Sequence, residues 1–158
     1  MSEIPYEKRP YRPCVGIFLI NKNKKVFGGK RIDNRAEAWQ MPQGGIDPGE
    51  SVLEACMREM KEEIGTKAAK FLLEHRNWLY YDIPSPLADR LWDGKFKGQK
   101  QKWMALRFTG KDQDININTE NPEFCEWRWL NPDELVRFAV PFKRKVYDNV
   151  LDAFKNLI

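Results

Sequence analysis

The stretch GGIDPGESVLEACMREMKEEIG, from Gly44 to Gly65, constrains this chain more than any other, because a glycine-rich loop runs directly into one short helix. Ser51 with Glu54 three residues later is a capping box, which predicts that the helix begins there, and Gly65 predicts its end. The apolar residues that recur at helical spacing predict the face packed on the core; they are Leu53, Cys56, Met57, Met60 and Ile64.

The same helix places Glu59, Glu62 and Glu63 together beside that face, whereas Arg58 and Lys61 point toward the outer face. Like charges at these spacings cost an isolated helix about 0.2–0.5 kcal/mol per pair, so we expect a partner that offsets the cost. Clustered carboxylates suit Mg²⁺ and Mn²⁺, which also bind phosphate oxygens. The three glutamates on one side of the helix therefore indicate a divalent-metal site that acts on a phosphoanhydride. Taken alone, the charge run is more typical of a solvated acidic helix.

The loop before the helix fits the metal site. Gly44 and Gly45 allow the backbone to approach a metal or a phosphate closely, and the turn at Pro48 and Gly49 delivers Glu50 to the start of the helix. A sequence pattern that fixes many residues in one register, that is, at set spacings from one another, is a stronger signal of function than a lone glycine motif. That register holds Gly44, Glu50, Arg58, Glu59, Met60, Glu62, Glu63 and Gly65.

The rest of the chain mixes strands and helices without regular alternation, so we predict an α+β fold, a mixed sheet flanked by helices. We expect one domain over residues 1–158, with a polar arm at 1–12. Strands are predicted at 14–20, 25–31, 38–41, 71–83 (as one strand or two joined by a turn), 100–110 and 124–130. Helices are predicted at 51–64, from Asn131 to Pro141 and at 143–157, and loops at 43–50, 84–99 and 112–123.

Composition narrows the range of partners. The net charge of +4 favours anionic partners, although we expect no DNA partner. The longest apolar run, VGIFLI at 15–20, is too short to span a membrane, so no membrane partner is expected. Cys14, Cys56 and Cys125 lie far apart without zinc-binding spacing, which predicts reduced thiols and a cytoplasmic protein.

The register at 44–65 resembles the Nudix box, the signature of hydrolases that cleave nucleoside diphosphates linked to another group. Thr66 departs from it, because an aliphatic residue usually follows the last glycine; we expect this to affect helix-end packing more than metal binding. The flanking segments YRPCVGIFLIN, WQMPQGGIDPGES, RNWLYYDIP, GQKQKW, PEFCEWRW and PFKRKVY resemble the branch of bacterial RNA pyrophosphohydrolases and dinucleoside polyphosphate hydrolases. Residues 85–97 match that branch least well. The resemblance implies the Nudix fold, an α/β/α sandwich with a mixed β-sheet.

The resemblance also implies a catalytic set. Glu59, Glu62, Glu63 and Glu123 would hold Mg²⁺, as more than one ion, with a backbone carbonyl near Gly44 as a further ligand; Mn²⁺ or Zn²⁺ are substitutes. Arg58 would orient Glu59 through a charged hydrogen bond, and Glu50 would brace the loop by pairing with Arg58. Glu59 is the first candidate for the general base, with Glu123 and Glu63 as rivals. An exposed loop acid is the alternative interpretation of Glu123.

Further residues are expected to bind the substrate. Arg12 and Arg31 match arginines that approach the phosphates or the 5′ base, and Phe142 matches an aromatic residue that stacks on a base. Gln43 joins this set from the loop before the helix, and Lys100 and Lys102 are candidates for holding an RNA 5′ end. Ordinary solvation of the lysines and simple packing of Phe142 remain open. His75 is expected to be structural, and Trp127 and Trp129 to lie in the core.

We therefore expect Mg²⁺-dependent hydrolysis of phosphoanhydride bonds at 5′-polyphosphorylated nucleotide ends. The substrate is 5′-triphosphorylated RNA, a dinucleoside polyphosphate such as diadenosine tetraphosphate, or both. Two alternatives stay open: an enzyme for which RNA is irrelevant, and a non-hydrolytic nucleotide or RNA sensor with the Nudix fold.

Overall fold

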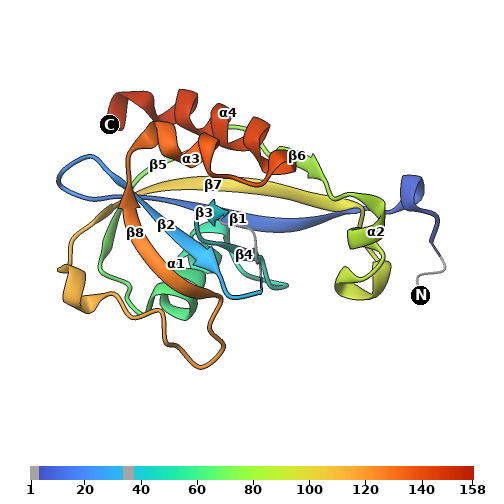
Figure 1. The fold of residues 1–158 in the computed structure, drawn as a ribbon, viewed down its shortest axis with the longest axis horizontal. Helices are drawn as coiled ribbons and strands as arrows, with labels where there is room; N and C mark the ends of the chain where they lie inside the picture. The colour runs from blue at the N-terminus through green and yellow to red at the C-terminus, as the bar shows by residue number, and fades with distance from the viewer. Residues whose placement is uncertain (1–3, 34–37) are drawn as a thin grey trace.

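The computed structural model describes residues 4–33 and 38–158, and within them one mixed sheet of eight strands is covered on both faces by helices (Figure 1). The strand order is β3-β2-β1-β7-β5, with β4 paired to β1, β6 to β7 and β8 to β2. The strands are β1 (Tyr11–Ile20), β2 (Val26–Arg31), β3 (Trp39–Gln40), β4 (Gln43–Gly45), β5 (Ala69–Glu74), β6 (Leu79–Asp82), β7 (Gly98–Phe108) and β8 (Phe124–Leu130).

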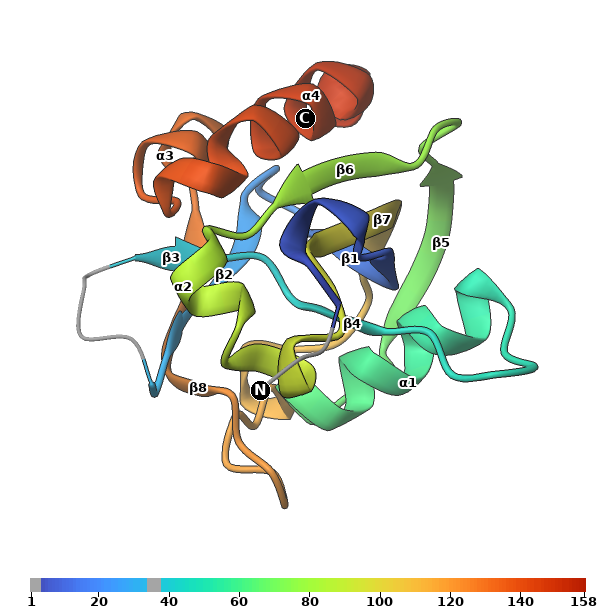
Figure 2. The ribbon, with the colours of Figure 1, turned by 90° about the vertical axis from the view of Figure 1, so that its right-hand side faces the viewer.

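Helix α1 (Val52–Ile64) covers one face of the sheet, and α3 (Pro132–Arg137) and α4 (Arg144–Phe154) cover the other (Figure 2). Short α2 (Ser85–Ala88) lies at one end of the sheet. Single 3₁₀ turns lie at Tyr6–Lys8, Leu91–Gly94, Asp112–Asp114, Pro141–Lys143 and Lys155–Leu157. The α/β/α sandwich predicted from the sequence is confirmed. None of the helices in the described part of the chain is long and apolar enough to cross a membrane.

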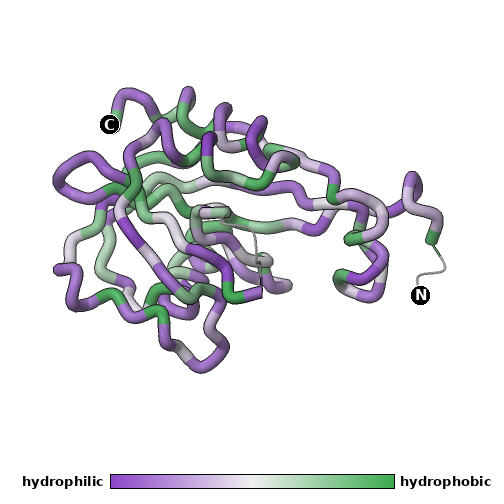
Figure 3. The backbone as a smooth tube through the Cα atoms, viewed as in Figure 1, coloured by the Kyte–Doolittle hydropathy of each residue, from purple (hydrophilic) through white to green (hydrophobic). Residues whose placement is uncertain are grey.

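Strands β1 and β7 run parallel side by side at the centre of the sheet, from Tyr11 opposite Gly98 to Ile20 opposite Arg107. Strand β1 is buried from Cys14 to Ile20, as expected for a central strand with helices on both faces. Apolar residues gather on the inner strands and hydrophilic residues on the loops and outer helix faces (Figure 3). The pairing brings the N-terminal strand beside a segment far along the chain.

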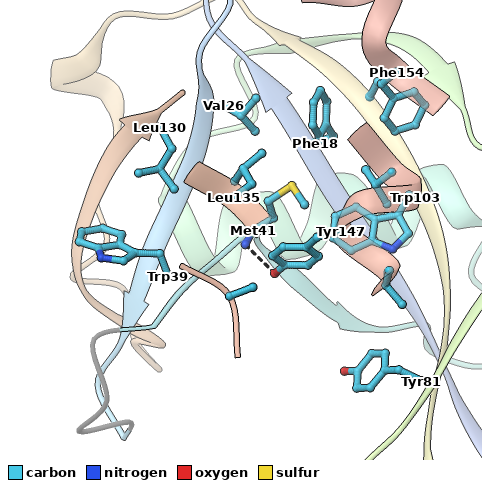
Figure 4. Packing of buried hydrophobic residues seen from close by; sticks show 14 of the residues in the cluster. Phe18, Val26, Trp39, Met41, Tyr81, Trp103, Leu130, Leu135, Tyr147 and Phe154 are labelled. Carbon is cyan, nitrogen blue, oxygen red and sulfur yellow. Dashed lines mark hydrogen bonds between the residues drawn. The ribbon is translucent and has the colours of Figure 1, made fainter. Parts of the chain in front are cut away.

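The sheet separates two apolar cores. The core under α4 contains Phe18, Trp103 and Phe154, and the Tyr147 hydroxyl there accepts a hydrogen bond of 2.9 Å from the Met41 N–H (Figure 4). The core under α1 contains Val15, Ile17, Leu19, Phe27, Cys56, Met60, Ile64, Leu106 and Phe124. The Tyr147 bond anchors the chain just before β4, and so helps to position the loop that precedes α1.

Helix α1 begins and ends as the sequence predicts. The Ser51 hydroxyl accepts from the Glu54 N–H at 3.1 Å, the Glu54 carboxylate accepts from the Ser51 N–H at 3.0 Å, and Gly65 is left-handed with φ 78°. The predicted apolar face is wrong at Leu53, which is 42% exposed. Leu53 lies within about 20° of Met60 around the helix, so its exposure means that the first turn extends past the core.

The other differences arise where pairing partners decide the structure. Residues 43–45 form β4 instead of a loop, because they pair with Cys14, Val15 and Gly16 of β1. Tyr11 and Arg12 belong to β1 and not to a polar arm. The segment 71–83 is two strands, β5 and β6. The helix that starts after Asn131 ends at Arg137, and Pro141 begins the turn that leads into α4.

Candidate active site

Three glutamates of α1, Glu59, Glu62 and Glu63, line a cavity of about 620 Å³. Glu59 and Glu63 are buried, whereas Glu62 is exposed. Glu123, just before β8, lines the same cavity, and the N–H of Ile32 donates to the Glu123 carbonyl at 3.0 Å. A second cavity of about 500 Å³ reaches these four glutamates from another side, past Thr119 and Glu120. The structure therefore brings together the four carboxylates that the sequence predicted for the metal site.

Arg58 is the centre of an ionic network beside the cavity. Its guanidinium donates to Glu50 at 2.6 and 2.9 Å, to Glu59 at 2.8 Å, to Glu62 at 3.2 Å and to the Gly45 carbonyl at 2.8 Å. The hydrogen bond from Arg58 holds the pKa of Glu50 at about 2. The sequence placed Arg58 toward the outer face of the helix; the long side chain folds back and binds Glu50, as the resemblance implied.

Gly44 and Gly45 of β4 must be glycines, because side chains from other elements lie directly against their backbone. A Cβ at Gly44 would overlap the carboxylate of Glu59, and a Cβ at Gly45 would overlap the guanidinium of Arg12. A side chain at either position would push a predicted catalytic or substrate-binding group out of place. These two glycines therefore let β4 bring Arg12 and Glu59 to opposite sides of the same short strand.

Burial makes the two inner carboxylates costly to ionise. The pKa of Glu59 is raised by burial, with the Arg58 guanidinium opposing the shift. The pKa of Glu63 is raised well above its ordinary value by burial and then by the charges of Glu59 and Glu123. Within the described residues, Oε2 of Glu63 is buried without a hydrogen-bond partner. An uncompensated carboxylate oxygen of this kind fits a divalent cation, which would supply the missing charge.

The carboxylates do not converge on a common centre. In residues 4–33 and 38–158, no group of three or more His, Cys, Asp or Glu side chains is arranged to hold a metal ion. Glu59 and Glu62 each bind the guanidinium of Arg58, at 2.8 and 3.2 Å. The donor set, carboxylate oxygens of which one is buried and unpaired within the described residues, fits a divalent cation.

Four of the residues predicted to bind the substrate, Arg12, Arg31, Gln43 and Phe142, line the cavity. Arg31 forms a two-pronged pair with Asp33, at 2.8 and 2.6 Å. The Phe142 ring stacks on Tyr81, which also lines the cavity, with the two ring centroids 5.7 Å apart. The cavity is thus lined by carboxylates together with guanidinium and aromatic groups.

Lys100 and Lys102 do not line this cavity. Alternate residues of β7 face opposite sides of the sheet, so Gln99 reaches the cavity while the neighbouring lysines point away. Lys100 lies 5.2 Å from the Trp78 ring, and Lys102 lies 3.5 Å from Glu74.

Sequence reasoning missed a buried polar network in the cavity wall. The Lys143 ammonium donates to Gln40 at 3.1 Å and to Gln43 at 3.3 Å, and burial lowers its pKa to about 8. Gln99 accepts from the Tyr81 hydroxyl at 2.7 Å and from the Gln43 amide at 3.3 Å. The one available signal was the presence of Lys143 and Gln99 inside the segments PFKRKVY and GQKQKW.

Residues expected to be structural lie outside the cavity. His75 is buried, and its Nε2 is 2.8 Å from the Asn149 side chain, which is a packing role. Trp127 and Trp129 are only half-buried and pack on Phe27 at the edge of the core under α1. The hydroxyl of buried Thr66 accepts from the Ala68 N–H at 3.0 Å, so this departure from the box lies in the packing after α1.

Comparisons with known proteins agree with this geometry. A family model described as NUDIX domain matches residues 10–150. An RNA pyrophosphohydrolase of Rickettsia bellii (strain OSU 85-389) is 56% identical over 149 residues, which cover 94% of this chain and 92% of that protein. The E. coli dihydroneopterin triphosphate pyrophosphohydrolase structure is similar with a TM-score of 0.70 at 19% identity, covering 89% of this chain and 97% of that one.

A C. elegans Ap4A hydrolase binary complex is similar with a TM-score of 0.65 at 18% identity, covering 93% of this chain and 99% of that one. At such low identity these two structures show the fold alone. The family model and the relative from Rickettsia bellii extend over nearly the whole chain and include the glutamates of α1. The chain therefore belongs to the Nudix family.

Proposed function

We propose that this chain is a magnesium-dependent Nudix pyrophosphohydrolase that removes phosphates from 5′-triphosphorylated RNA. One observation carries the proposal: a single cavity is lined both by four carboxylates and by the cationic and aromatic side chains of Arg12, Arg31, Lys143 and Phe142. A polyphosphate with a nucleoside at one end has the complementary arrangement, since its anionic chain needs cations and its base needs a stacking surface. The relatives named RNA pyrophosphohydrolase support RNA as the substrate.

The carboxylates of Glu59, Glu62, Glu63 and Glu123 would hold Mg²⁺, with the Gly44 carbonyl as a further ligand and Mn²⁺ or Zn²⁺ as substitutes. Several carboxylates in one place favour more than one ion. Divalent cations bound there would supply Lewis-acid polarisation of the phosphoanhydride and a lower pKa for the attacking water.

The side chains divide the remaining work. Glu59 accepts the proton of the attacking water, and burial raises its pKa, which makes the carboxylate a stronger base than an exposed one. Arg58 orients Glu59 through their 2.8 Å hydrogen bond. Glu123 and Glu63 are the rival bases, because both face the same cavity.

Other side chains that line the cavity bind the substrate. Arg12 and Gln43 meet the phosphates, and Arg31 and Phe142 meet the 5′ nucleoside. Lys100 lies on another face of the sheet, so we assign it to phosphates farther along an RNA chain. Lys102 is buried and paired with Glu74, so it joins that contact only if Glu74 releases it.

The rival substrate is a dinucleoside polyphosphate, which the fold shared with the C. elegans Ap4A hydrolase supports. Steady-state kinetics separate the two: kcat/KM is measured with purified protein and Mg²⁺ for 5′-triphosphorylated RNA and for diadenosine tetraphosphate. We expect 5′-monophosphorylated RNA with release of pyrophosphate or successive phosphates, and a higher kcat/KM for RNA. A higher value for diadenosine tetraphosphate, cleaved to ATP and AMP, would reassign the substrate.

The same assay tests the non-hydrolytic alternative. We expect EDTA to stop product release and added Mg²⁺ to restore it. Binding of RNA or nucleotide without product release under any divalent cation would make the protein a sensor instead of an enzyme.

Cys14, Cys56 and Cys125 are free thiols, which supports our placement of this single-domain protein in the reducing cytoplasm.

A further inference from the structure

The segment between β6 and β7, at 84–97, is more than the plain loop that the sequence predicted. It folds into α2 and a kinked turn at Leu91–Gly94, in which two consecutive residues, Trp92 and Asp93, are left-handed with φ 49° and 56°. Left-handed backbone is unfavourable for residues other than glycine and persists only where the surroundings impose it. The strained Trp92 lines the candidate active-site cavity.

The N-terminal residues hold this segment in place. The guanidinium of buried Arg9 forms a 2.7 Å ion pair with Asp89, and the Tyr6 hydroxyl donates to the Ile83 carbonyl at 2.7 Å. At the other end, the Lys97 N–H donates to the Pro10 carbonyl at 3.1 Å. The Trp92 ring is therefore held against β1, close to the strand position of Arg12.

Trp92 forms one wall of a clamp around Arg12. The guanidinium carbon of Arg12 lies 4.9 Å from the centroid of the Trp92 ring, a cation–π distance. Another side of the guanidinium lies against Gly45, where a Cβ would overlap it, and Nη1 is 3.3 Å from the Cys14 sulfur. The guanidinium is thus fixed by an aromatic ring, a glycine and a sulfur atom, none of which neutralises its charge.

Arg31, which also lines the cavity, and Arg58, which binds Glu59 beside it, differ in this respect. Arg31 is paired with Asp33 and Arg58 with Glu50, at 2.6 Å in each case. Within the part of the chain that the structure describes, Arg12 has no ion-pair partner. A fixed and uncompensated guanidinium facing a cavity is prepared to bind an anion, because little conformational freedom remains to be lost.

We propose that Trp92 is a positioning residue, which holds the guanidinium of Arg12 so that its charge meets the substrate's polyphosphate. The inference rests on the proposed function, because it assigns a role within the same hydrolysis. Trp92 acts through Arg12 and not by touching the reacting atoms. This gives a specific task in substrate binding to residues 85–97, the part of the chain that least resembles the family branch.

Three variants test the role of the ring. Trp92→Leu keeps an apolar side chain but removes the aromatic face, Trp92→Phe keeps a smaller face, and Tyr80→Leu removes an exposed aromatic ring outside the cavity. Each is assayed for kcat and KM with 5′-triphosphorylated RNA and Mg²⁺. We expect Trp92→Leu to raise KM by about two- to thirty-fold, the range that one cation–π contact supports, with kcat changed less than about two-fold. Trp92→Phe and Tyr80→Leu should stay within about two-fold of the wild type.

The second part of the test removes Arg12. If Trp92 acts through the guanidinium, Trp92→Leu adds nothing to the KM of an Arg12→Gln protein. A further increase in that background, as direct stacking of Trp92 on a base would give, overturns the proposal. So does an unchanged KM in Trp92→Leu or in Arg12→Gln, or equal losses in Trp92→Leu and Trp92→Phe. An inactive wild-type protein would instead contradict the proposed function itself.

Discussion

The carboxylate of Glu59 lies directly against the backbone of Gly44, with no room between them for a methyl group. Gly44→Ala should therefore displace Glu59, and we expect kcat to decrease by about 100-fold or more, because small misplacements of a catalytic group have effects of this size. The measurement is steady-state hydrolysis of triphosphorylated RNA with Mg²⁺, together with circular dichroism to verify the fold.

Gly49→Ala is the matched control for that variant. Gly49 has φ 83°, but a Cβ there would meet no atom within 4 Å. We expect the free energy of unfolding to decrease by about 1 kcal/mol from backbone strain, with kcat within about two-fold of the wild type. Equal kcat values for the two alanine variants would show that Gly44 is not needed to place Glu59.

Glu59→Gln removes the proposed general base and keeps the size of the side chain. We expect kcat to decrease by about 10²- to 10⁴-fold, with RNA binding retained. Kinetics and direct binding of triphosphorylated RNA are compared with those of Glu123→Gln. Near-normal turnover by the Glu59 variant would refute this assignment and pass the role to Glu123 or Glu63.

Glu63→Gln tests how much stability the protein loses by burying the charged carboxylate of Glu63. Because the pKa of Glu63 is raised above its ordinary 4.5, the folded protein without metal binds the proton more tightly than the unfolded chain. Stability in EDTA should therefore decrease as the pH rises from about 4.5 through the raised pKa. The stability of the variant should decrease less as the pH rises. At neutral pH the variant should be about 1–3 kcal/mol more stable than the wild type.

The same variant should lose most of the stabilisation that Mg²⁺ gives the wild type, since a ligand that binds the folded state raises its stability. Urea unfolding at pH 5 and pH 8, with EDTA or with Mg²⁺, measures both effects. The expectation is wrong if the wild type and the variant show the same pH dependence in EDTA.

Lys143→Met tests the buried cation in the cavity wall. The ammonium is held by Gln40 and Gln43, so its charge is fixed beside the substrate space. We expect KM for triphosphorylated RNA to rise by about 10- to 150-fold, because a charged hydrogen bond contributes about 1.5–3 kcal/mol. Thermal unfolding should not occur at a lower temperature, because the variant avoids burying a charge. An unchanged KM would exclude Lys143 from binding.

A prediction far from the cavity concerns Lys24, in the turn between β1 and β2. Its φ of 62° is left-handed, and its N–H donates to the Asn21 carbonyl at 3.0 Å. Lys24→Gly should raise the free energy of unfolding by up to about 1 kcal/mol, because glycine adopts this conformation without steric cost. Urea unfolding measures the change, and a less stable variant would contradict it.

Local patterns were sufficient for α1. Its two ends follow from Ser51 and Gly65, and the common arc of Glu59 and Glu63 follows from the helical repeat, because all these relations lie within one regular element. The family follows from the same stretch, since the spacing of its glycines and glutamates is itself the signature. Three of the four carboxylates of the candidate site could therefore be predicted from neighbouring residues, whereas Glu123 came only from the family resemblance.

The rest of the site depends on pairing between distant segments. The parallel register of β1 and β7 brings Arg12 beside Gln99, and the alternation of β7 alone does not say whether its glutamines or its lysines face the cavity. Lys143 and Trp92 reach the cavity from turns whose shape depends on contacts with the sheet and the N-terminal residues. Side chains far apart along the chain meet only when the sheet register and helix packing form together, and no local pattern encodes that geometry.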